Sequence, residues 1–177
     1  MYLSKKTYVK NWSFQKPEEQ HEITVKKGGE VRKDINPDKI SNIEEEAGYW
    51  RKANAIHNWF VENVQDGVDE CQTSYVDTEK LKELLEICKK VKASLENSPK
   101  RTIQVKNGWD GEKDTFIDVE IFEDIGVAEE LLPTQGGFFF GSTEYDEGYL
   151  QDINDTINII EEALLTEDAD FYYHASW

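Results

Sequence analysis

Residues 78–96 constrain the fold more than any other part of the sequence. Apolar side chains recur there at helical intervals and would line one face of an α-helix. These positions are Leu81, Leu84, Leu85, Cys88, Val91 and Leu95. Asp77 is a suitable N-cap, and the segment from Asn97 to Pro99 ends the pattern. We therefore predict a helix with one buried face, which needs a second layer of structure to pack against.

Two further long segments have a helical period. In residues 149–165 the apolar spacing from Leu150 to Leu164 is 3-4-3-4. In residues 44–65 the spacing from Tyr49 to Val64 is 4-3-4-4, and three glutamates come first, where they favour a helix N-terminus. We predict a helix over each segment, and a short helical turn over 127–132.

The remaining segments alternate apolar and polar residues, which is typical of β-strands. We predict strands at 7–14, 39–43, 71–76 and 170–177. Residues 22–33, with a turn at Gly28-Gly29, and residues 101–123 predict two hairpins. The fold class is therefore α+β, with about three main helices packed on a small, mostly antiparallel sheet. We expect a single domain over residues 1–177, with a variable hairpin insert at about 99–125.

Composition excludes several classes of protein. The chain has 177 residues, of which 38% are hydrophobic and 12% aromatic, enough for a packed core. No apolar run approaches the roughly 20 residues that span a membrane. Two cysteines and a polar N-terminal segment give no disulfide framework and no signal peptide. We expect no membrane contact and a location in a reducing cytoplasm.

Negative charge is the strongest compositional signal. The net charge is −17, and nearly all of the excess lies in residues 101–177, with three basic and nineteen acidic residues. Such a surface repels phosphates, so direct nucleic-acid binding is not expected. It would attract a basic protein, although the charge alone is equally explained by solubility. The oligomeric state stays open, because this charge opposes close self-association.

The first candidate binding segment is residues 49–60. Trp50, Arg51, Lys52, Asn54 and His57 combine a flat ring, cations and polar groups. On a helix they would form a wall for an anionic, nucleotide-like ligand, by stacking and charge-assisted hydrogen bonds. The alternative is that Trp50 and His57 belong to the core and that Arg51 pairs with a glutamate.

The second candidate segment is the glycine- and aromatic-rich stretch 133–149. Its glycines and hydroxyls before a helix suit an anion, and we assign Thr134, Ser142 and Tyr145 to the ligand site. The stretch is neither a Walker loop nor a dinucleotide fingerprint. Alternatively, Ser142 and Asp146 cap the next helix, and the three consecutive phenylalanines at 138–140 form a buried strand.

The sequence gives little indication of metal binding or of catalysis. The three histidines are far apart in sequence, and no HExxH or CxxC motif occurs, so we expect no metal and no cofactor. No GxSxG motif is present, and no residue is assigned a catalytic role. A binding protein is therefore favoured over an enzyme.

Several segments together resemble a family of small acidic bacteriophage and prophage proteins. They are KKTYVKNW, EITVKKGGEVR, YWRKANAIHNWFVENVQ, ELLPTQGGFFFGSTEYDE and YYHASW. The resemblance covers most of the chain and implies a cytoplasmic accessory protein of an infected or lysogenic cell. By analogy, small acidic phage proteins are often antagonists of host defence.

Three functions follow as hypotheses. In the first, the protein antagonises host defence by sequestering an anionic nucleotide-like ligand. In the second, its acidic surface over residues 110–170 imitates DNA and occupies a basic groove of a host nuclease or another host protein. In the third, it is a small hydrolase of a phosphorylated ligand, with His57 or a carboxylate as general base.

Overall fold

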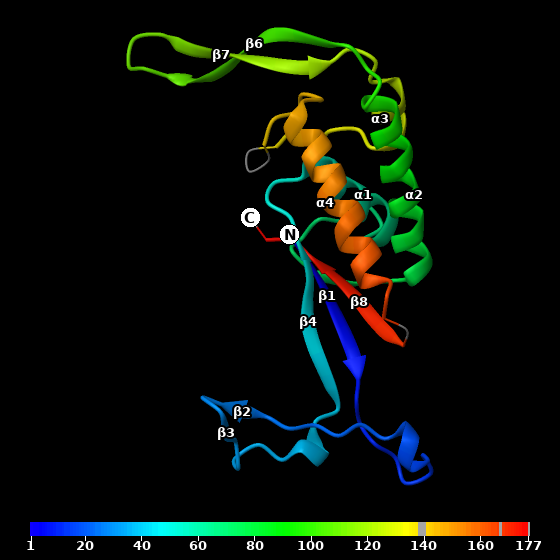
Figure 1. Ribbon diagram of the computed structural model, residues 1–177. Coiled ribbons are helices and arrows are strands. Elements are labelled where there is room, and N and C mark those ends of the chain that lie inside the picture. Colours follow the sequence, from blue (N-terminus) through cyan, green and yellow to red (C-terminus); the bar gives the residue numbers. More distant parts are fainter. Residues whose placement is uncertain (138–140, 167, 177) are drawn as a thin grey trace.

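A four-stranded antiparallel sheet forms the base of the molecule. The computed structural model describes residues 1–137, 141–166 and 168–176. The strand order is β4-β1-β8-β5 (Figure 1). Their bounds are β1 (Tyr2–Tyr8), β4 (Asn42–Tyr49), β5 (Thr73–Val76) and β8 (Ala169–His174). The strand that comes last in the described sequence thus lies between two strands that come much earlier.

Helices cover one face of this sheet. Helices α1 (Asn54–Val64) and α4 (Glu147–Ala163) contact the sheet. Helix α2 (Thr78–Leu95) packs against α4, and the short α3 (Gly126–Leu131) packs against α2. Alternate residues of the two central strands enter the core, among them Leu3 of β1 and Phe171 and Tyr173 of β8. Ring stacking of Tyr173 on Phe60 of α1 joins the two layers at a centroid distance of 3.9 Å. The predicted α+β class is confirmed.

The helix predicted at 78–96 is confirmed as α2. The Asp77 carboxylate caps its first turn by accepting a hydrogen bond from the Glu79 N–H at 2.8 Å. All six apolar positions of the predicted stripe are buried. The helix predicted at 149–165 is α4, which begins two residues earlier and is capped by Asp146.

The helix predicted over 44–65 is wrong in its first half. Residues 42–49 form β4, and α1 begins only at Asn54. Cross-strand pairing explains the difference, because Glu45 lies opposite Lys5 of β1 and their side chains form an ion pair at 2.9 Å. Gly48 also lets α4 approach, since a Cβ there would lie 2.3 Å from Ile159. These long-range contacts outweigh a local helical preference.

Other strand positions also shift. The strand predicted at 7–14 is wrong over 9–14, because β1 runs over Tyr2–Tyr8 and shares only Thr7 and Tyr8 with it. The strand predicted at 39–43 overlaps β4 only at its first two residues. The strands predicted at 71–76 and 170–177 correspond to β5 and β8. The phenylalanine strand proposed for residues 138–140 lies outside the described residues.

Two excursions leave this body at opposite ends (Figure 1). The first, residues 9–41, joins β1 to β4 and contains the predicted small hairpin, β2 (Lys26–Lys27) and β3 (Glu30–Val31). Gly28 and Gly29 form its turn at φ of 60° and 88°, a region that favours glycine. The second is the predicted hairpin of β6 (Lys100–Trp109) and β7 (Asp114–Phe122). Within the described ranges, no helix combines the length and hydrophobicity needed to span a bilayer.

Candidate functional site

A pocket of about 340 Å³ lies where α1 and α4 begin. Its volume is at the lower end of the range for small-molecule sites. Three parts of the chain form it: the segment that leads from β4 into α1, the loop before α4, and the first turns of α4. The lining residues are Arg51, Lys52, Asn54, Ala55, Gly141, Ser142, Asp146, Gly148, Tyr149 and Asp152.

The start of α1 borders this pocket through Asn54 and Ala55. The first intrahelical bond of α1 runs from the His57 N–H to the Ala53 carbonyl, so the N–H groups of residues 54–56 have no acceptor within the helix. The N-cap residue is Ala53, which has no side-chain oxygen to satisfy them, and the first turn holds no acidic residue. The partial positive charge of this helix end is thus left for an anion.

Two cations stand beside these donors. Arg51 and Lys52 are exposed, and neither forms an ion pair with any carboxylate in the described part of the chain. Lys52 has a left-handed backbone, with φ of 63°, at the bend between β4 and α1. In a chain of net charge −17, two unpaired adjacent cations at a pocket mark a place suited to an anionic group.

Asn54 connects the two sides of the pocket. Its side-chain nitrogen donates to the Ser142 carbonyl at 2.8 Å, and its side-chain oxygen accepts from the Gln135 N–H at 3.0 Å. The Ser142 hydroxyl oxygen accepts from the Glu144 N–H at 3.0 Å, which leaves the hydroxyl hydrogen to donate. The loop before α4 is therefore fastened to the start of α1.

Thr134 and Tyr145 support this loop without lining the pocket. The Thr134 hydroxyl donates to the Thr143 carbonyl at 2.9 Å, and the Thr134 N–H donates to the Tyr145 hydroxyl at 3.3 Å. Of the eight residues assigned to the site from sequence, four line the pocket: Arg51, Lys52, Asn54 and Ser142.

Trp50 and His57 lie in the core. Each has an exposed fraction of 2%. The Trp50 indole N–H donates to the Thr156 hydroxyl of α4 at 2.9 Å. His57 lies between the Tyr173 hydroxyl at 2.7 Å from Nδ1 and the Asp69 carboxylate at 3.1 Å from Nε2. The structure therefore shows the alternative interpretation, in which both side chains pack in the core. Neither ring has a face that is accessible to a ligand.

Sequence reasoning did not single out Asp152, which lines the pocket from α4. Burial, and then the nearby carboxylates of Asp155 and Asp146, raise the pKa of Asp152 from 3.8 to about 7. Its position could have been noticed, because Asp152 borders the buried stripe of α4 that contains Tyr149, Ile153 and Thr156. A carboxyl that is half protonated near neutral pH can donate a hydrogen bond to an anion.

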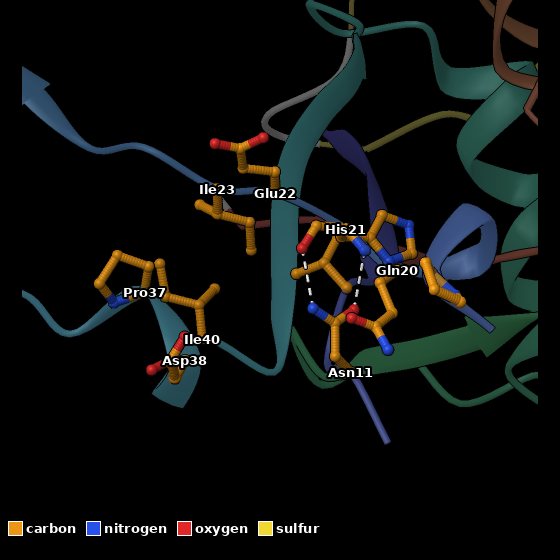
Figure 2. A pocket seen from close by; sticks show the side chains of 10 residues that line it. Asn11, Gln20, His21, Glu22, Ile23, Pro37, Asp38 and Ile40 are labelled. Atoms are coloured by element: carbon orange, nitrogen blue, oxygen red, sulfur yellow. Dashed lines mark hydrogen bonds between the residues drawn. The ribbon is translucent and has the colours of Figure 1, made fainter. Parts of the chain in front are cut away.

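A larger cavity, of about 740 Å³, lies in the excursion of residues 9–41. Figure 2 shows the paired hydrogen bonds, both 2.8 Å, between Asn11 and His21 in its wall. Cations such as those of the first pocket are absent from its lining, which instead includes Glu22 and Asp38.

Metal and disulfide chemistry have no structural counterpart among the described residues. No group of three His, Cys, Asp or Glu side chains there is placed to hold a metal ion. Cys71 and Cys88 are free thiols, and burial raises the pKa of Cys88 to about 12, so this thiol is unreactive.

Comparisons with known protein families, with curated proteins and with solved structures found no match to this chain. The chemistry of the pocket is therefore argued from its own residues.

Proposed function

We propose that this protein binds an anionic, phosphate-bearing small molecule in the pocket between α1 and α4. The observation that carries this proposal is the convergence of Arg51 and Lys52 with the uncapped start of α1 in one pocket. Guanidinium, ammonium and helix N–H groups are the donors that phosphates prefer in proteins. The pocket volume of about 340 Å³ suits a nucleotide-sized ligand.

The biological role of such binding is sequestration. The resemblance to small phage and prophage proteins supports an accessory protein that antagonises host defence from the cytoplasm of the host cell. Holding a nucleotide-like signal needs affinity and no catalysis. Since Trp50 and Trp59 are buried, with exposed fractions of 2% and 5%, the proposal relies on the phosphate rather than on ring stacking.

Native mass spectrometry of gently purified protein tests for a bound ligand. A mass excess that denaturation releases as a phosphorylated compound is the expected result. Titration calorimetry with AMP then measures the phosphate contribution, with adenosine as the matched ligand without phosphate. AMP should bind and adenosine should not. Equal binding of both compounds would overturn the proposal.

Variants of the two cations locate the site. Arg51→Gln and Lys52→Gln should each weaken AMP binding by about tenfold or more, since hydrogen bonds to charged groups contribute ~1.5–3 kcal/mol. Lys33→Gln removes an exposed cation of the 9–41 excursion and should leave the affinity unchanged. An equal loss in all three variants would indicate a nonspecific charge effect instead.

One observation favours the hydrolase as a second candidate. Asp152 shares the pocket with Arg51 and Lys52, and its pKa of about 7 suits a general acid or base. If the protein is a hydrolase, water converts AMP to adenosine and phosphate on incubation, or cleaves a dinucleotide to its mononucleotide products, and Asp152→Asn abolishes this conversion while binding persists. Recovery of the unchanged ligand would leave sequestration as the function.

A further inference from the structure

Tyrosines gather on the second face of the central sheet, which no helix in the described part of the chain covers. Cross-strand register places alternate residues of β1, β4, β5 and β8 on this side, opposite the core residues Leu3 and Tyr173. The chain has eight tyrosines, and five of them occupy this face. We call this the tyrosine face, defined by Tyr2, Tyr8, Tyr49, Tyr75 and Tyr172.

These side chains are accessible. The exposed fractions of Tyr2, Tyr8, Tyr49 and Tyr75 lie between 37% and 54%, and Tyr172 is half-buried among them. A solvent-facing sheet surface normally carries polar side chains. Exposed tyrosines in such number are typical of an interface, where they supply contact area at little entropic cost.

The tyrosines form two groups of contacting rings on this face. Tyr2 and Tyr49 contact each other at a centroid distance of 5.1 Å, and Tyr75 and Tyr172 do so at 5.8 Å. The Lys6 ammonium lies 5.6 Å from the Tyr8 ring and 6.0 Å from the Tyr172 ring, which links the two strands β1 and β8.

Carboxylates border the same surface. Glu44 and Glu46 lie opposite Lys6 and Ser4 on the tyrosine side of the sheet, and Asp170 lies opposite Lys6 on β8. Asp170 also raises the pKa of the Tyr8 hydroxyl, which places it beside that ring. Three carboxylates thus border the face, beside the Lys6 ammonium and the N-terminal ammonium of Met1, which lies near Glu46.

We propose that the tyrosine face binds an arginine-rich surface of a partner protein. Guanidinium groups stack on aromatic rings and pair with carboxylates in the same contact, so rings bordered by acidic groups complement arginine better than any other side chain. Phosphates of a nucleic acid would meet the carboxylates of this face, and a second copy would bring two negative faces together. This surface is distinct from the anion pocket, and Asp170 is the one residue of the acidic stretch 110–170 that it uses.

Peptide titrations test the chemistry of recognition. The probe is an unstructured peptide with six arginines, compared with a peptide of the same length with six lysines, in 150 mM salt. Calorimetry should give an affinity for the arginine peptide at least about fivefold higher, because arginine adds stacking to the charge attraction. The NMR ring signals of the five tyrosines should shift, while signals of Trp109 and Phe116 on the hairpin should not.

Matched variants test the location. Tyr49→Ser and Tyr75→Ser remove exposed rings from the face, and Phe14→Ser removes a still more exposed ring elsewhere. Each of the two tyrosine variants should lower the affinity for the arginine peptide by about fivefold, and the Phe14 variant should leave it unchanged. The pair Glu44→Gln/Glu46→Gln should weaken it, whereas Glu129→Gln/Glu130→Gln on α3, with the same change in net charge, should not. Dispersed amide spectra confirm folding of each variant.

Three results would overturn the proposal. Equal affinities for the two peptides would show only nonspecific attraction to an acidic chain. Equal effects of the face variants and their controls would place the contact elsewhere. Shifts of the tyrosine rings by oligothymidylate, with none by the arginine peptide, would assign the face to single-stranded nucleic acid.

Discussion

The side chain of Asn54 holds the carbonyl of Ser142 at 2.8 Å, although 88 residues separate them in the sequence. The same amide accepts the Gln135 N–H, so one buried side chain fastens two loop segments to the start of α1. The geometry of the pocket depends on this connection more than on the cations at its edge.

Replacing Asn54 with Ala should loosen the pocket. Both backbone groups would lose their partner, and the expected loss in free energy of unfolding is ~1–3 kcal/mol. AMP affinity should fall although no charge changes. Urea denaturation measures the stability, and hydrogen exchange should show faster exchange in residues 134–136. Asn63→Ala, which removes only a local bond to the Trp59 carbonyl in the same helix, is the control and should leave AMP affinity intact.

Gly48 sets the distance between β4 and α4. A methyl group there would lie 2.3 Å from Cγ2 of Ile159, so Gly48→Ala should destabilise the fold by ~1–3 kcal/mol through overpacking. The double variant Gly48→Ala/Ile159→Ala should recover part of that loss. Gly126→Ala, at a position with open space in α3, should cost nothing. Thermal denaturation distinguishes these cases, and equal loss in both single variants would contradict the packing argument.

Asp152 should make both stability and ligand affinity depend on pH. Its pKa is 3.8 in the unfolded chain and about 7 when folded, so the folded state binds more protons and loses stability as pH rises from 4 to 7. The gain in melting temperature from Asp152→Asn should therefore grow over this interval and level off above it. AMP affinity of the parent protein should fall relative to that of the variant over pH 6–8. A constant difference between the two proteins at all pH values would refute this role.

Tyr173 should support the core without affecting the ligand. Tyr173→Phe removes the hydroxyl at 2.7 Å from His57 Nδ1 and should cost ~1–3 kcal/mol of unfolding free energy. The AMP affinity should change by less than about twofold, which separates this residue from Arg51. Tyr172→Phe, one position along β8 on the opposite face, should change stability by less than about 0.5 kcal/mol.

The β6–β7 hairpin should be removable. Its register pairs run from Lys100↔Phe122 to Trp109↔Asp114, and only its base is buried, at Ile121 and Phe122. Joining Thr102 to Glu120 through Asn-Gly should shift the free energy of unfolding by less than about 1 kcal/mol. Phe122→Ala in the full-length chain should cost ~3–5 kcal/mol. Differential scanning calorimetry measures the melting temperature of each variant. A large decrease in the melting temperature of the shortened chain would contradict the prediction.

Local patterns predicted some elements well and others poorly. The α2 stripe was recognisable because its buried face repeats over five turns and both ends carry clear signals. Residues 44–49 misled because their glutamates suit a helix start, whereas their pairing with Lys5 and Lys6 depends on a strand far away in the sequence. Pairing between distant strands produces no periodic pattern of apolar residues within one segment of the sequence.

The residues of the candidate site were likewise predictable only in part. Arg51, Lys52, Asn54 and Ser142 were identifiable by residue type, and folding brings them to one pocket. Trp50 and His57 also have side chains that are suited to ligand binding. The backbone bends at Lys52, so the predicted continuous helix, which would have placed these two residues beside the cations, does not form. Asp152 borders the apolar stripe of α4 in the sequence, but only its burial in the structure separates it from the other acidic residues of the chain, 37 in all.

The central position of β8 has a consequence for synthesis on the ribosome. While residues 1–168 emerge, β1 has its partner β4, but its other edge and the edge of β5 stay unpaired. Sheet closure must wait for Ala169–His174, so this chain folds late and through long-range contacts, which slows folding. Nascent chains stalled before that strand would present an open sheet edge to cellular chaperones and proteases.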